Sequence, residues 1–184
     1  MGTFVTPGPT GRSRATSIVD RMRGAATFHV PTYESVEHDT TATGQAAVVV
    51  ALAAVASAIG NSFRGGPGIF GALLGYLAGW ALWSGITYLV GTRLFGGTAT
   101  WGELLRTLGF AQAPGILLLL AIVPVLGALV KGVVALWLLA AGIVAIRQAL
   151  DVGIGKAVLT ALVGWVAWVL TSWIVSSVLG VPLY

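Results

Sequence analysis

Residues 100–124 read TWGELLRTLGFAQAPGILLLLAIVP and pass from a polar, charged segment into a wholly apolar one. Thr100 and Glu103 have the spacing of a capping box, in which each side chain accepts a hydrogen bond from the backbone N–H of the other residue. Pro114 cannot donate a backbone hydrogen bond, so we expect a kink there, and Gln112 or a hydroxyl on a neighbouring helix satisfies the carbonyl that the kink frees. The stretch therefore predicts a capped helix at a membrane surface that turns into a membrane-spanning one.

The composition of the whole chain indicates that its solvent is lipid. Of its 184 residues, 57% are hydrophobic and 9% are charged, and the mean hydropathy is +0.92. A soluble domain carries about 25% charged residues, so this chain cannot cover itself with a water-facing surface. The net charge of +4 comes from scattered basic residues, which are typical of topology determinants and do not predict a nucleic-acid partner.

Five segments are apolar enough to cross a bilayer, which takes about 20 residues of helix. They are residues 44–62, 69–91, 107–127, 129–148 and 156–180. The predicted fold class is therefore all-α, a polytopic membrane protein with five transmembrane helices over residues 44–184. Residues 1–43 form a separate, cytoplasmic N-terminal segment in this interpretation.

The distribution of basic residues predicts the orientation of the chain. Eight Lys and Arg residues fall on the side of the N-terminus and two fall on the opposite side. The positive-inside rule then places the N-terminus in the cytoplasm and the C-terminus outside. The absence of cysteine and the richness in Ala, Val and Gly favour a prokaryotic inner membrane.

The segment SIVDRMRGAATF places Ile18, Met22 and Ala25 on one helix face, and Ser13 or Thr16 is available as the N-cap. We expect a short amphipathic helix that lies in the membrane interface with its arginines toward anionic headgroups. The membrane-surface residues in this prediction are Arg12, Arg14, Arg21 and Arg23. A disordered tail is the alternative interpretation.

The second predicted span contains GALLGYLAG, with Gly71, Gly75 and Gly79 spaced four residues apart. Such a face of bare backbone lets another helix approach closely. Because lipid gives no hydrophobic drive for helix association, close van der Waals contact has to supply it. The pattern predicts tight helix packing, with the partner helix expected within the chain and a second subunit as the alternative.

Four tryptophans lie near the middle of predicted spans, away from the interfacial belts where Trp usually concentrates. They are Trp80, Trp137, Trp165 and Trp168. We expect their rings to fill space within the bundle, and contact with an apolar ligand such as a pigment, quinone or lipid is the alternative.

Few residues could carry chemistry. Both histidines, His29 and His38, lie in the N-terminal segment, so no span offers a haem or chlorophyll ligand. Glu37, His38 and Asp39 are adjacent and do not converge on one metal ion, so we interpret them as a solvated patch. No span centre holds a charged residue, which argues against an ion-coupled transporter. We therefore expect no enzyme activity, catalytic residue, metal or cofactor.

A longer pattern around the opening stretch resembles the Yip family of Rab-interacting membrane proteins, and its prokaryotic members in particular. The pattern comprises Phe95-Gly96-Gly97, Leu105-Arg106, Gly109-Phe110-Ala111, Pro114 and, at the last span, Lys156-Ala157. The resemblance covers about residues 40–175 and implies five spans, a cytoplasmic N-terminus and a short exterior C-terminus. Eukaryotic members carry an Asp-Leu-Tyr-Gly-Pro stretch in the N-terminal segment, where this chain reads VPTYESVEHD.

Three functions are compatible with these patterns. The leading hypothesis is a non-enzymatic membrane-organising or trafficking-like scaffold of Yip type, which packs its helices against other membrane proteins, itself or lipids. The first alternative is an accessory subunit of a larger respiratory, photosynthetic or transport complex. The second is a small-molecule channel or transporter with a polar cavity around Gln112 and Pro114.

Overall fold

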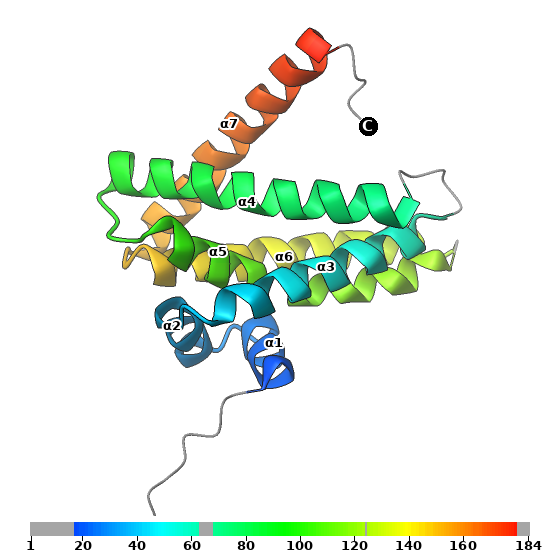
Figure 1. The fold of residues 1–184 in the computed structure, drawn as a ribbon, viewed down its shortest axis with the longest axis horizontal. Helices are drawn as coiled ribbons and strands as arrows, with labels where there is room; N and C mark the ends of the chain where they lie inside the picture. Colours follow the sequence, from blue (N-terminus) through cyan, green and yellow to red (C-terminus); the bar gives the residue numbers. More distant parts are fainter. Residues whose placement is uncertain (1–16, 63–67, 124, 180–184) are drawn as a thin grey trace, which may run out of the picture.

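The computed structural model describes residues 17–62, 68–123 and 125–179, and it describes side chains up to residue 170 except that of Trp168. Every regular element in these ranges is helical (Figure 1), which confirms the predicted all-α class. The elements are α1 (Ile18–Ala26), α2 (Val30–His38), α3 (Ala42–Gly60), α4 (Gly68–Phe95), α5 (Trp101–Phe110), the 3-10 helix η2 (Ala113–Ile122), α6 (Gly127–Ala149) and α7 (Ile154–Leu179).

Three of these helices, α3, α4 and α6, are long and apolar enough to cross a membrane. Helices α5 and η2 together form a fourth candidate span, with a bend of 40° between them. The predicted span 107–127 is therefore not one helix, because it comprises the last four residues of α5 and the separate η2. Over the described residues the chain has three to four candidate spans, and the count of five stays a prediction.

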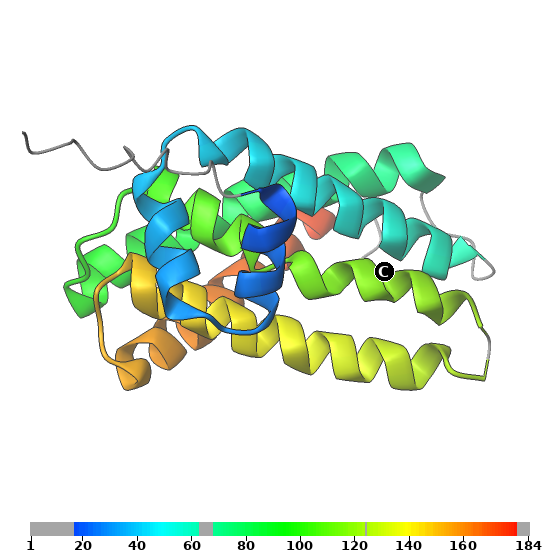
Figure 2. The same cartoon turned by 90° about the horizontal axis from the view of Figure 1, so that it is seen from below.

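The long helices run side by side in one bundle (Figure 1). We call the end where α3 begins and α4 and α6 finish the N-side, and the other end the far side. Helix η2 packs against both α3 and α6 (Figure 2), while α4 packs against α3, α5 and α7. Helix α7 starts against α4 and α6 and leads away from the bundle (Figure 1).

Helices α1 and α2 form a hairpin that lies across one side of this bundle (Figures 1 and 2). Helix α1 has Ser17 as its N-cap, whose Oγ accepts a hydrogen bond from Asp20 N at 3.1 Å. The expected caps were Ser13 and Thr16, which lie outside the described residues. Ser17 is therefore the residue that satisfies a free N–H of the first turn.

The apolar stripe predicted for this helix packs on the chain itself. Ala25 is fully buried, and Ile18 and Met22 pack against the same hydrophobic core. These side chains bury their apolar area against the protein, so the expected insertion of the stripe into lipid is not what the structure has. The outward face of α1 is consequently its polar face.

Helix α2 was not predicted, although its sequence carries two local signals for it. Pro31 stands in the first turn, where its missing N–H has no acceptor to lose. Tyr33 and Val36 are three residues apart and both are fully buried, as expected for one face of a helix. The helix has only nine residues, and a hydrophobic pattern of this length does not distinguish a helix from a loop.

Two glycines outside the predicted glycine face of α4 permit close approaches to α3. A Cβ at Gly109 would lie 2.7 Å from the Ala46 Cβ and 3.2 Å from the ring of Trp80. A Cβ at Gly60 would overlap the carbonyl oxygen of Leu118. These positions bring α5 and η2 against α3, so the bent pair is held between the neighbouring helices.

Candidate functional site

The capping box at the start of α5 is present. Glu103 N donates to Thr100 Oγ1 at 3.3 Å, and Thr100 N donates to Glu103 Oε2 at 2.7 Å. The first N–H groups of a helix have no acceptor within the helix, so these two bonds determine where α5 begins. From this start, Arg106 falls on the buried face of α5.

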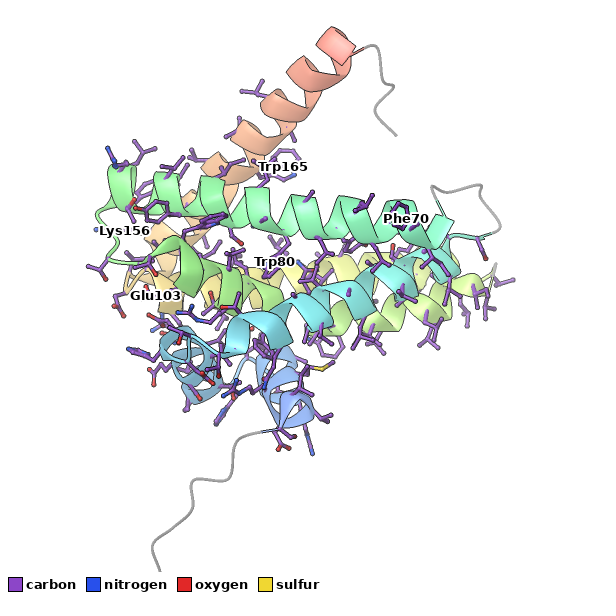
Figure 3. The ribbon with its side chains drawn as sticks, viewed as in Figure 1. Phe70, Trp80, Glu103, Lys156 and Trp165 are labelled. Atoms are coloured by element: carbon purple, nitrogen blue, oxygen red, sulfur yellow. The ribbon has the colours of Figure 1, made fainter. Side chains whose placement is uncertain are left out.

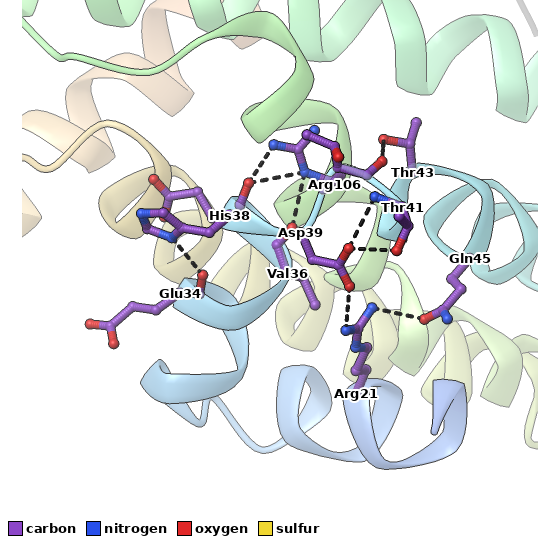
Figure 4. Close-up of polar contacts among 11 residues, drawn as sticks. Arg21, Glu34, Val36, His38, Asp39, Thr41, Thr43, Gln45 and Arg106 are labelled. Atoms are coloured by element: carbon purple, nitrogen blue, oxygen red, sulfur yellow. Dashed lines mark hydrogen bonds and ion pairs between the residues drawn. The ribbon is translucent and has the colours of Figure 1, made fainter. Parts of the chain in front are cut away.

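Arg106 holds α2 against α5 (Figure 4). Its side chain is buried, and its Nε donates to the carbonyl oxygens of Val36 at 2.9 Å and Glu37 at 3.0 Å. Its Nη2 also donates to the Glu37 oxygen. These carbonyls end α2, where the last turn of a helix has unpaired oxygens and a partial negative charge. The guanidinium therefore serves as a C-terminal cap of α2.

Arg21 was expected at the membrane surface, and the structure contradicts this. It is 7% exposed, its Nη2 lies 2.6 Å from Asp39 Oδ2, and its Nη1 donates to Gln45 Oε1 at 3.0 Å (Figure 4). The Thr41 hydroxyl and the Arg21 guanidinium, as hydrogen-bond donors, lower the pKa of Asp39 to about 2. Of the other predicted surface arginines, Arg23 is exposed, and Arg12 and Arg14 lie outside the described residues.

Glu37 was interpreted as part of a solvated patch, but it is 7% exposed. Burial, followed by the charge of Asp151, raises the pKa of Glu37 to about 7, with Glu103 and Glu34 adding to the rise and His38 opposing it. These groups come from α2, α5 and the turn after α6, so only the tertiary structure brings them together. Over the described residues, no group of three or more His, Asp and Glu side chains could hold a metal ion.

Two aromatic side chains tie the hairpin to α6. The Tyr33 hydroxyl is buried and donates to Ala25 O at 2.9 Å, and it lies 3.4 Å from Ala141 O. Trp137 Nε1 donates to Ala26 O at 2.7 Å. The mid-span Trp137 thus has a partner within the chain, in agreement with a packing role.

The predicted glycine face of α4 is open. A Cβ placed on Gly75 or Gly79 would meet no atom within 4 Å, and Gly71 is half-buried. Phe70 and Leu74 on the same helix are 75% and 56% exposed. The described part of the chain therefore does not supply the partner helix that was expected for this face.

An open groove of about 310 Å³ adjoins the glycine face, between α3, α4, α5 and α7. Its lining includes Gly79, Gln112 and the aromatic residues Tyr76, Trp80, Trp83 and Trp165. Trp80 Nε1 donates to Leu105 O at 2.9 Å, and Trp165 lies where α7 crosses α4 (Figure 3). Trp80 and Trp165, two of the predicted mid-span tryptophans, thus line one groove. The side chain of Trp168 is outside the described ones.

The bend between α5 and η2 lies at Ala111 and Gln112, and Pro114 stands in the first turn of η2. At that position the missing N–H of proline costs no hydrogen bond. Pro114 therefore starts a new helix, where a kink in a continuous one was expected. The buried hydroxyls of Ser84 and Thr87 on α4 have no hydrogen-bond partner among the described residues, so neither satisfies a carbonyl at this bend.

One contact on the far side was also missed. Lys131, in the second turn of α6, donates to Asn61 Oδ1 just after α3. In the charge count, Lys131 is one of the two basic residues on the side opposite the N-terminus. No local sequence pattern pairs it with a residue seventy positions earlier. The contact links α3 and α6, the two helices that pack on η2.

A bundle of long apolar helices with a polar hairpin bonded to its side defines a helical membrane protein. Residues 28–181 match the family model of the Yip1 domain. The chain belongs to the Yip family, as its sequence pattern had indicated. No curated protein and no solved structure matches it.

Proposed function

We propose that this chain is a non-enzymatic five-span scaffold that packs the open face of α4 against a helix of another membrane protein or of a second copy. The observation that carries this proposal is the open face itself. In the apolar stretch of α4 that qualifies it as a candidate span, 11% of the residues are buried within the structure, whereas 39% are buried in the corresponding stretch of α3. Gly75 and Gly79 expose bare backbone in the middle of that face.

The physical reason is that lipid does not favour helix association by itself. A helix gains from leaving lipid only where it can approach a partner closely, and small residues allow that approach. The large exposed side chains of Phe70 and Leu74 beside the glycines offer ridges that a partner helix can pack between. The eight-to-two distribution of basic residues supports an N-terminus in the cytoplasm and a C-terminus outside. The cysteine-free composition, rich in Ala, Val and Gly, supports a prokaryotic inner membrane.

The test is a pair of glycine substitutions at open positions. Gly75→Leu adds a bulky side chain to the proposed face, and Gly132→Leu adds the same side chain to an open position on α6. Energy transfer between donor- and acceptor-labelled chains in vesicles measures self-association. Purification in mild detergent followed by mass spectrometry identifies foreign partners.

We expect Gly75→Leu to weaken association at least about tenfold, about 1.4 kcal/mol, and Gly132→Leu to leave it unchanged. A Cβ at either position meets no atom within 4 Å, so we expect both variants to fold. If both associate like the unmodified chain, the open face of α4 is not an interface and the scaffold proposal fails.

The aromatic groove favours one second candidate, an accessory subunit of a larger membrane complex. Trp165 is 56% exposed at the edge of the groove, and Trp is enriched where proteins contact one another. Stoichiometric foreign subunits in the mild-detergent purification would favour this candidate. Recovery of the chain alone would exclude it.

A further inference from the structure

The apolar surface of the bundle does not reach the same height on its two sides. On α4 the exposed large apolar residues run from Ile69 to Leu94, which is a rise of about 38 Å. On the opposite side, those nearest the N-side are Val48 on α3 and Leu139 on α6. Each stands twelve residues from the far end of its helix, which is a rise of only about 18 Å.

Helix α1 lies at the height where the shorter surface stops. Trp137, which bonds to the last carbonyl of α1, stands ten residues into α6, about 15 Å from its far end. Helix α2 lies closer to the N-side than α1, because Tyr33 bonds to Ala141 O on α6 and Val36 O accepts from Arg106 on α5. Figures 1 and 2 show α1 crossing the bundle near the middle of its length.

The outward face of α1 is too polar for the interior of a bilayer. Its exposed residues include Ser17, Asp20 and Arg23, while its apolar stripe faces the core. The hydrocarbon region is about 30 Å thick, so an undeformed bilayer would place this face in its middle. A charged side chain there costs about 2.5–3.5 kcal/mol by insertion scales.

We infer that the bilayer is thinned beside α1, so that headgroups and water of the N-side leaflet reach down to this helix, while the leaflet keeps its full height beside α4. Ser17, Asp20 and Arg23 interrupt the outward face of α1, so it offers no continuous apolar surface for a protein partner. Lipid headgroups and water can supply the hydrogen bonds and counter-charges that these three side chains need. Val19 and Phe28 are 66% and 40% exposed and enter the boundary with the acyl chains, as interfacial helices require.

This inference concerns the lipid beside α1, and it holds whether acyl chains or a partner helix cover the open face of α4. The two apolar heights differ by about 20 Å, and a bilayer adapts to such a mismatch by thinning while the protein tilts. The chain thereby imposes two leaflet heights on the lipid around it. A face that thins one leaflet is an interaction surface whose partner is the lipid headgroup region.

The chain contains no cysteine, so single-cysteine labelling has no background. Arg23→Cys reports on α1. Leu82→Cys is the protected reference on α4, seven residues after Gly75 on the same open face, where Leu82 is 47% exposed at a comparable height of about 21 Å; acyl chains or a partner helix cover this thiol in either case. Each full-length variant is reconstituted at high lipid-to-protein ratio in phosphatidylcholine–phosphatidylglycerol vesicles made permeable by freezing and thawing. A membrane-impermeant maleimide is then added, and denaturing detergent shows that both thiols are reactive.

We expect Arg23→Cys to react at least ten times faster than Leu82→Cys, and to slow down in vesicles of longer acyl chains. Equal protection of the two thiols would overturn the inference, because α1 would then lie under acyl chains. A rate that falls as the protein-to-lipid ratio rises would also overturn it, since a second copy would be covering α1. A rate independent of chain length would place α1 in bulk water and overturn it as well.

Discussion

Replacing Arg106 by methionine tests whether this one side chain holds the N-terminal hairpin on the bundle. Its three donor contacts reach two carbonyl oxygens, of Val36 and Glu37, and hydrogen bonds from charged groups contribute about 1.5–3 kcal/mol each. Methionine also removes a buried charge, and the relief of its desolvation offsets part of the loss. We therefore expect a net loss of about 2–4 kcal/mol.

A loss of this size lowers the Tm by about 4–16 °C for a chain of this length. Thermal unfolding in detergent can be followed by the fluorescence of the seven tryptophans. Arg106→Lys is the matched control, because it keeps the charge but loses the planar guanidinium that reaches both carbonyls. Its Tm should lie between that of the unmodified chain and that of Arg106→Met. The rate of hydrogen exchange of the α2 amides should be lowest in the unmodified chain, higher in Arg106→Lys and highest in Arg106→Met.

The reasoning would be refuted by an Arg106→Met chain with an unchanged Tm and unchanged protection of α2. In that case the hairpin would be held on the bundle by the remaining contacts, namely the hydrogen bonds of Tyr33 to Ala141 O, Trp137 to Ala26 O and Arg21 to Gln45. A fall in Tm without added exchange in α2 would mean that Arg106 stabilises α5 alone.

Two further predictions follow from the same region. Because the pKa of Glu37 is raised to about 7, its neutral form is the one that the fold favours, and the stability it contributes is present below about pH 4.5 and is lost as the pH rises through about 7. Glu37→Gln should therefore leave the Tm unchanged at pH 4 and raise it at pH 8, where it stabilises the fold by at most about 3 kcal/mol. An equal Tm difference at both pH values would contradict this. Trp137→Phe keeps most of the ring volume but removes the bond to Ala26 O, so it should cost about 1 kcal/mol and speed hydrogen exchange in α1, with no change expected in α4.

Local features of the sequence were sufficient for much of the candidate site. The Thr100–Glu103 capping box depends on residues three positions apart, and the break near Pro114 depends on one residue that lacks an N–H. The partner of Arg106 could not be read in the same way, because it is a helix end some seventy residues earlier. Arg21 was misplaced for the same reason, since Asp39 becomes its neighbour only when the hairpin closes.

The sequence by itself determined the solvent and the helical class of this protein, because composition and apolar run length depend on each segment alone. It also indicated the family, through short motifs in a fixed order along the chain. It also determined that Gly75 and Gly79 share one helix face, but only the tertiary structure decided that this face is open. The height at which α1 crosses the bundle was likewise decided by contacts between distant segments, of which the Trp137 bond to Ala26 is the clearest. In lipid these contacts are packing and hydrogen bonds between helices, and neither leaves a periodic trace in the sequence.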